Sequence, residues 1–140
     1  MSEVRYCKDK DEQYRMYNNY IFNHVYGVQK SYKKALNAFK EIFPDVYESK
    51  QMVRKLQHNI INHDDSKYDK ENEFWQYAAK FFPIEGTDPN SKDVNDSFEL
   101  AWLHHVNNNP HHPAHWVLYD EFEVKIFDMP DIYIIEMLCD

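Results

Sequence analysis

The stretch "NIINHDDSKYDK", residues 59–70, marks the point where an apolar helix gives way to a run of charged side chains. Ile60 and Ile61 are typical of the end of a buried helix. His63 and Asp64 follow at once, so we expect both side chains to lie where that helix leaves the core. A histidine beside an aspartate is a weak signal on its own, because the same pair often forms a helix cap or an ordinary hydrogen bond.

Helical periodicity extends on both sides of this stretch. Apolar residues recur at helical spacing upstream until Pro44 interrupts them, and downstream until Pro83 does the same. The helix containing Ile60 has an inner stripe that also includes Val53, Leu56 and Ile61. A later helix is expected to be capped by Ser91 or Asp93. Helices are thus predicted over residues 12–43, 46–62, 71–82, 94–105 and 131–140.

Polar segments separate these helices. Residues 83–93 carry Gly86 and Pro89, which are typical of turns, and residues 107–113 combine asparagines with two prolines. Residues 114–127 are ambiguous between helix and extended chain. Only two glycines occur in 140 residues, which argues against a fold rich in strands and turns. The sequence predicts an all-α fold, a single-domain helical bundle over residues 1–140.

The composition excludes several classes of protein. A formal net charge of −8 without a Lys/Arg cluster argues against nonspecific binding to nucleic acids. No apolar run is long enough to span a bilayer, and the polar start "MSEVRYCKDKDEQ" has no signal segment. Cys7 and Cys139 lie near opposite ends of the chain without CxxC spacing, which favours reduced thiols. We therefore expect a cytoplasmic protein without a membrane partner.

Eight histidines are the unusual feature, and most of them are clustered. His24 lies on an apolar helical face and is expected to point into the core. Imidazoles and carboxylates from separate helices that meet in a bundle core are what a divalent or ferrous ion requires, and burying them without a metal would be costly. A ligand at a chain terminus is loosely held, so Glu136 or Asp131 is an alternative to Asp140. The candidate metal ligands are His24, His63, Asp64, His104, His105 and Asp140.

The order His … His-Asp … Asp on helices resembles the HD-domain superfamily of metal-dependent phosphohydrolases. In this resemblance His24 corresponds to the histidine of the first helix, and His63-Asp64 to the defining doublet. Asp140 corresponds to the distal aspartate that completes the metal site. The resemblance covers residues 24–140 and implies an HD-type helical bundle.

Two shorter segments look like the HD-GYP branch of that superfamily. "HDDSK", residues 63–67, is similar to the pattern HD-x-G-K, with Ser66 in the glycine place and Lys67 in the lysine place. "HHVNNNPH", residues 104–111, resembles a segment in which two histidines bind an additional metal. The GYP element is absent, so the cyclic dinucleotide specificity of that branch is not implied. The C-terminal half also looks like a small family of uncharacterised bacterial and phage proteins.

The resemblance implies a phosphohydrolase with one or two divalent ions (Mn, Fe, Co, Ni or Mg). The metal would lower the pKa of a bound water, which attacks the phosphorus of a small phosphorylated substrate such as a nucleotide. Lys67 is expected to face the phosphoryl oxygens. Asp64 would bridge two ions if one of the later histidines supplies a second site. The candidates for protonating the leaving oxygen are His111, His112 and His115.

Two other functions remain open at this point. The same helical scaffold with additional histidines can hold two iron ions and act as an oxygenase. A binding or inhibitory protein is the other alternative, with the His/Asp cluster holding a structural metal or forming only a hydrogen-bond network. A homodimer is compatible with each of the three.

Overall fold

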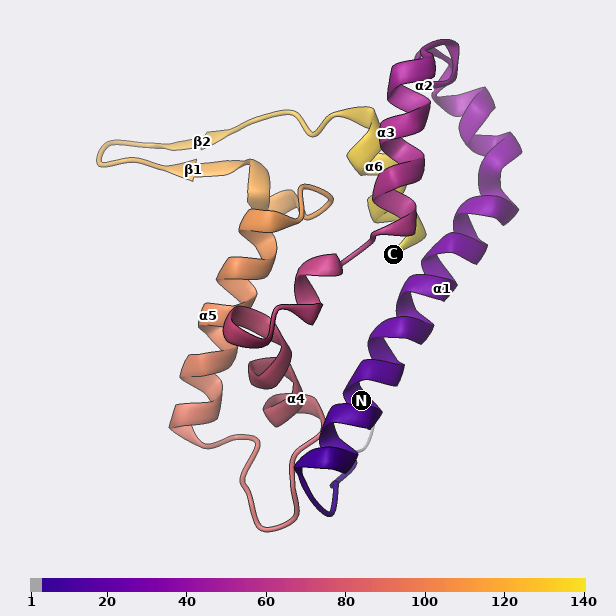
Figure 1. Cartoon of the computed structure of the whole chain (residues 1–140). Coiled ribbons are helices and arrows are strands. Elements are labelled where there is room, and N and C mark those ends of the chain that lie inside the picture. The colour runs from indigo at the N-terminus through magenta and orange to yellow at the C-terminus, as the bar shows by residue number, and fades with distance from the viewer. Residues whose placement is uncertain (1–3) are drawn as a thin grey trace. The chain divides into compact units, whose positions relative to one another are not determined.

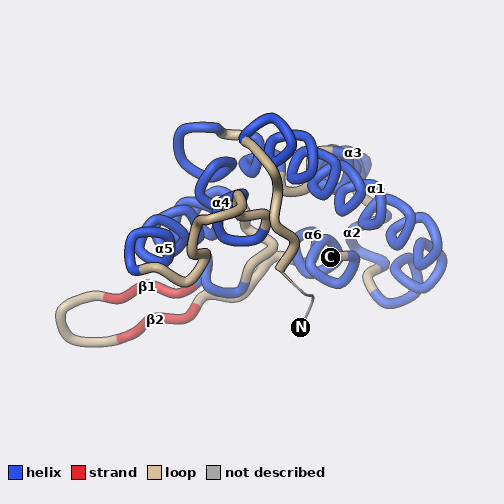
Figure 2. Tube along the Cα trace, turned by 90° about the horizontal axis from the view of Figure 1, so that it is seen from below, coloured by secondary structure: helices blue, strands red, loops and turns tan. Residues whose placement is uncertain are grey.

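The computed structural model describes residues 4–140, and most of them are helical (Figures 1 and 2). The all-α prediction is confirmed, apart from one short two-stranded hairpin. Within these residues no helix is both long and apolar enough to cross a bilayer. The elements in chain order are α1 (Lys10–Ile42), α2 (Pro44–Glu48), α3 (Lys50–Ile61), η1 (Asp65–Tyr68), η2 (Lys70–Phe74), α4 (Trp75–Phe81), α5 (Lys92–Asn108), η3 (Pro113–Trp116), β1 (Val117–Tyr119), β2 (Val124–Ile126) and α6 (Asp131–Cys139).

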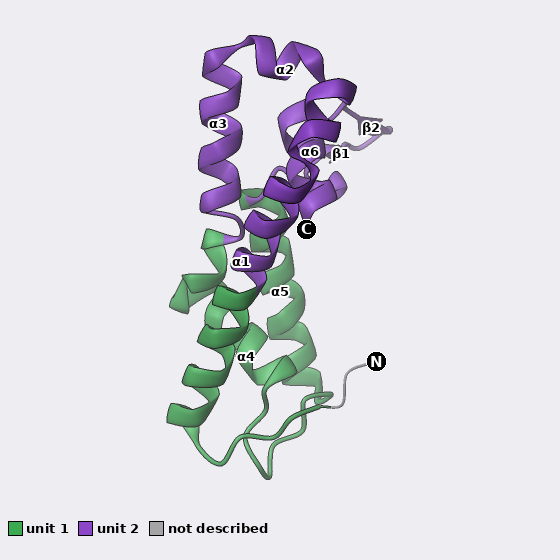
Figure 3. Ribbon diagram, turned by 90° about the vertical axis from the view of Figure 1, so that its right-hand side faces the viewer, with its two compact units in different colours: residues 1–23, 65–108 green, residues 24–64, 109–140 purple. Residues whose placement is uncertain are grey.

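The described residues group into two compact units (Figure 3). The first unit combines the residues up to Asn23 with Asp65–Asn108, and the second combines His24–Asp64 with Asn109–Asp140. The long helix α1 contributes to both units. The single-domain organisation stays a prediction.

The helix predicted over residues 46–62 is divided in two at Ser49. This residue has an extended backbone (φ −102°, ψ 112°), and its hydroxyl accepts a hydrogen bond from the Met52 N–H at 3.3 Å. A serine in this conformation is a favourable N-cap, so α3 begins afresh after it. Pro44 ends α1 as predicted and also begins α2, because a proline is tolerated in the first turn of a helix.

The core of the second unit forms where α6 packs against α3. Leu56 and Ile135 are fully buried, and Ile60 is 3% exposed. Ile61 is 63% exposed, so its assignment to the inner stripe was wrong. Each residue turns a helix by about 100°, and the residue after Ile60 therefore faces away from α6. The core members are Val28, Phe39, Val46, Leu56, Ile60, Ile132, Ile135 and Cys139.

An aromatic cluster forms the core of the first unit. The Tyr17 ring lies 4.9 Å from the Phe74 ring in an edge-on arrangement, and 6.4 Å from the Tyr77 ring, measured between centroids. Such pairs add specific geometry to the apolar area that they bury. Trp102 on α5 is 44% exposed and does not belong to this core.

The ambiguous segment 114–127 forms the hairpin. β1 and β2 pair antiparallel, with Val117 opposite Ile126 and Tyr119 opposite Val124. The helix α5 continues through Asn108, three residues beyond its predicted end, and the following loop contains Pro110. The last helix, α6, is confirmed at Asp131–Cys139.

Replacing Ile60 or Ile61 by alanine tests the face that α3 buries. Ile60→Ala should lower the free energy of unfolding by about 2–5 kcal/mol, because it removes buried methyl groups and leaves a cavity. The matched control Ile61→Ala should change it by less than about 1 kcal/mol, because that side chain is already in water. Urea denaturation of both variants measures the difference, and equal losses would contradict the assigned face.

Candidate metal centre

The centre begins where α3 ends. Asn62 follows the helix, and its side-chain amide donates to the His58 carbonyl at 2.9 Å. His63 and Asp64 come next and are 1% and 2% exposed. Asp64 has a positive φ of 56°, the left-handed region that residues other than glycine seldom occupy. Strained backbone of this kind persists where the surrounding structure holds it, and it concentrates at functional sites.

Four predicted ligands converge at this point of the second unit. The Nε2 atom of His24 lies 2.8 Å from Asp140 Oδ1 and 3.5 Å from Asp64 Oδ2. The Nε2 atom of His63 lies 3.3 Å and 3.5 Å from the same two oxygens. One donor atom from each of these residues lies within 4.8 Å of the others. The segments that supply them are α1, the end of α3 and the end of α6, far apart in sequence.

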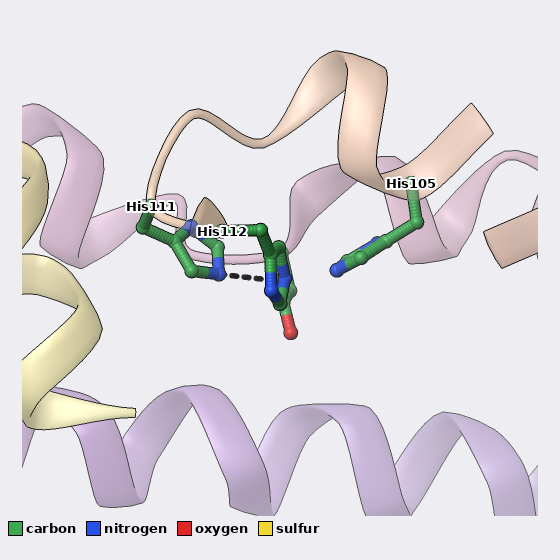
Figure 4. A group of neighbouring side chains, drawn as sticks. His105, His111 and His112 are labelled. Atoms are coloured by element: carbon green, nitrogen blue, oxygen red, sulfur yellow. Dashed lines mark ion pairs between the residues drawn. The ribbon is translucent and has the colours of Figure 1, made fainter. Parts of the chain in front are cut away.

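His111 also faces this cluster; the sequence suggested it as a proton donor or as a ligand of a second ion. Its Nε2 atom lies 3.3 Å from Asp64 Oδ1 and 3.6 Å from Asp140 Oδ2. In Figure 4 a dashed line marks an ion pair made by the His111 ring. The side chain is 1% exposed. His112 follows it on the same loop, with its ring centroid 4.2 Å from that of His111. The two oxygens of Asp64 thus face different imidazoles.

Glu136 lies on the other side of these imidazoles. Its Oε1 atom is 2.9 Å from His63 Nδ1 and 3.1 Å from His111 Nδ1. The sequence offered Glu136 or Asp131 as alternatives to Asp140. The structure places Glu136 on the Nδ1 side of His63 and Asp140 on the Nε2 side, so the two carboxylates are not interchangeable. Asp131 is exposed at the opposite end of α6.

The donor set suits a divalent transition metal. Imidazole nitrogens and carboxylate oxygens are the usual ligands of Mn, Fe, Co, Ni and Zn. The Nε2 atom of His63 is buried, and its neighbouring oxygens at 3.3 and 3.5 Å are at the long limit of hydrogen bonding. A cation between these atoms would bind the nitrogen and both oxygens, whose contacts with one another are too long for strong hydrogen bonds.

Imidazoles and carboxylates shift one another's pKa values. Burial opposes the charge of His63, but hydrogen bonds to Asp140 and Glu136 outweigh it and raise its pKa to about 9. Burial likewise opposes the charge of Glu136, yet its hydrogen bonds to His111 and His63 hold its pKa below the ordinary value. Asp140 also has a lowered pKa, because hydrogen bonds to His24 and His63 outweigh its burial. Without a metal, the cluster is therefore held together as ion pairs.

His104 and His105 form a network with Glu73 in the first unit. Their Nδ1 atoms lie 2.7 and 3.0 Å from the two oxygens of Glu73, which is fully buried. Burial opposes the charge of Glu73, but hydrogen bonds to His105 and His104 outweigh it and lower its pKa. Sequence reasoning missed Glu73, because nothing in "KENEF" separates it from Glu71. That His104 and His105 are ligands of the metal stays a prediction.

The remaining predicted site residues are Lys67 and His115. Lys67 is half-buried in the first unit, with Nζ 5.9 Å from the centroid of the Tyr77 ring. His115 is half-buried in the second unit, with its ring 5.1 Å from that of Trp116. The roles suggested for both in phosphoryl transfer stay predictions.

The fold and the centre define a mostly helical protein with a buried His/Asp/Glu cluster that can hold a metal ion. Residues 13–140 match the model of the Family of unknown function (DUF5662), and the chain belongs to that family. No curated protein and no solved structure matches the chain.

The thermal stability of the metal-free protein should be highest between about pH 5 and pH 6.5. The raised pKa of His63 gives stability that is complete below 6.5 and lost as the pH rises through 9. The lowered pKa of Glu136 gives stability that is lost as the pH falls below 4.5. The alkaline loss is on the order of 3 kcal/mol, or roughly 10 °C in Tm.

Melting curves from pH 4 to pH 10 measure this profile. His63→Gln should reduce the fall of Tm at alkaline pH. The control His58→Gln, at an exposed position of α3, should leave that fall unchanged. A wild-type Tm that stays constant between pH 6 and pH 10 would contradict the assignment.

Proposed function

We propose that this protein is an HD-type metal-dependent phosphohydrolase that acts on a nucleotide or another small phosphoester. The observation that carries the proposal is the convergence of His24, His63, Asp64 and Asp140 at one point, where His63 and Asp64 are buried. Their order in the sequence is that of the HD-domain superfamily, and their donor atoms lie close enough to share one ion. The fold alone would not support an activity, so the proposal rests on the site.

His24, His63, Asp64 and Asp140 would hold the ion. A bound divalent ion supplies a water of lowered pKa and offsets the charge of a phosphoryl group. The carboxylate of Asp64 faces His24 and His63 with Oδ2 and His111 with Oδ1. This division of its oxygens supports Asp64 as a bridge to a second ion beside the first.

The reaction requires a proton for the leaving group. Water adds to phosphorus, the ester P–O bond breaks, and the leaving oxygen takes up a proton. His112 suits this transfer, because it is half-buried beside the cluster and an imidazole can both donate and accept a proton. His115, farther along the same loop, is the alternative donor. Lys67 is proposed to meet the phosphoryl oxygens as negative charge builds on them.

A di-iron oxygenase is the second candidate. It is favoured by the third imidazole, His111, which adds a nitrogen donor beside Asp64. Iron accepts mixed imidazole and carboxylate ligands as readily as the other candidate metals do. Oxygen consumption by the iron-loaded protein, without phosphate release, would separate this function from hydrolysis.

Metal content measured by mass spectrometry tests the centre. Wild-type protein loaded with Mn, Fe, Co or Ni and then washed should retain one or two equivalents. His63→Ala and Asp64→Ala should each retain less than about a tenth of this, because a lost ligand costs more than the 10- to 100-fold typical of an outer-shell change. The control His58→Ala should bind metal like wild type. A wild type that retains none of these ions would contradict the proposal.

Phosphate release from a panel of nucleotides and phosphomonoesters tests the reaction itself. The loaded wild type should release phosphate from at least one class of substrate, and Asp64→Asn should reduce the rate by at least roughly 100-fold. His112→Gln should keep the metal and lower the rate by roughly 10²-fold, as expected for a lost general acid. Full metal loading without turnover on any substrate would favour a structural role for the ion.

A further inference from the structure

Glu136 contacts both of the buried imidazoles that face Asp64. A single oxygen, Oε1, lies 2.9 Å from His63 Nδ1 and 3.1 Å from His111 Nδ1. All three residues are buried: Glu136 is 4% exposed, and His63 and His111 are each 1% exposed. His63 follows α3 and His111 follows α5, so one carboxylate on α6 connects two separate segments of the chain.

This contact decides which nitrogen of each ring can bind a metal ion. A carboxylate accepts hydrogen bonds, so the Nδ1 atom of each ring carries the proton. A metal ion that binds displaces the second ring proton, so Nε2 is the nitrogen whose lone pair can bind it. In both rings Nε2 faces the carboxylates of Asp64 and Asp140, at distances between 3.3 and 3.6 Å.

We propose that Glu136 is a positioning residue that fixes the Nδ1–H form of His63 and His111 together, and that His111 is thereby a metal ligand. The inference rests on the proposed function only in that a metal occupies the centre. Of the two roles that the sequence left open for His111, proton donor and ligand of a second ion, it selects metal binding and leaves proton donation to His112 or His115.

The Nδ1 side of the rings is the less suitable place for the ion. It offers one carboxylate oxygen, Glu136 Oε1, between the two imidazoles. The Nε2 side offers the oxygens of Asp64 and Asp140 as well as a third imidazole, His24. Outer carboxylates that accept the second ring N–H of a ligating histidine are a common means of orienting it.

NMR of the ring nitrogens in the metal-free protein tests the contact without any metal. Wild type should show slowly exchanging Nδ1–H protons for both His63 and His111, since both rings are buried. Glu136→Leu should lose both signals, and Glu136→Gln, which keeps one neutral acceptor, should retain them with altered shifts. Absence of either signal in wild type, or its persistence in Glu136→Leu, would overturn the inference.

Zinc titration of the same variants tests the consequence for the metal. The Kd should rise about 10- to 100-fold in Glu136→Leu and less in Glu136→Gln. Zinc should also change the nitrogen chemical shift of His111 Nε2 in wild type. The matched control Ile135→Val, on the neighbouring core position of α6, should lower Tm without changing either Kd or the ring signals.

The two proposals fail in different ways. If wild type binds no zinc, manganese or iron, the proposed function fails, and the ligand role of His111 fails with it, while the Nδ1–H signals still decide the role of Glu136. If wild type binds zinc but the chemical shift of His111 Nε2 does not change, the ligand role of His111 is overturned and the metal centre stands. If Glu136→Leu does not fold, Glu136→Gln carries the same comparison.

Discussion

The buried carboxylate of Asp64 is the constraint on which the second unit depends. It is 2% exposed, and an isolated charge at such a depth would be very unfavourable. Three imidazoles face its two oxygens within 3.5 Å, and they come from three different segments. The middle of α1, the end of α3 and the loop that carries His111 therefore meet where this charge has to be compensated.

Each unit contains a buried glutamate that accepts from the Nδ1 atoms of two histidines. Glu136 connects His63 with His111, and Glu73 connects the neighbouring residues His104 and His105. The difference lies in sequence distance, since one pair is 48 residues apart and the other is adjacent (111 − 63 and 105 − 104). Only the first arrangement joins two histidines that are distant in sequence, so only there does the carboxylate fix the relative positions of two separate imidazole-bearing segments.

The resemblance to the HD-domain superfamily and the inward-facing position of His24 predicted that His24, His63, Asp64 and Asp140 would lie together. The predicted set of ligands did not include His111, which also faces Asp64. Glu73 was beyond such reasoning, since it is buried by the single π turn η2, which no periodicity in the sequence signals. The exposure of Ile61 depends on where α6 packs, which is a tertiary effect, whereas the break at Ser49 is a local capping arrangement. The hairpin, with its alternating Val, Tyr and Ile, was compatible with either structure until pairing partners were known.

The two cysteines are both buried, and they lie in different units. Burial and the charge of Glu136 raise the pKa of the Cys139 thiol to about 11, and burial and the charge of Glu12 raise that of Cys7. Both thiols are therefore protonated and shielded in the native state, and neither reacts readily with an alkylating reagent. The chain thus carries one built-in reporter for each unit: the rate at which each thiol becomes reactive measures how often its own surroundings open.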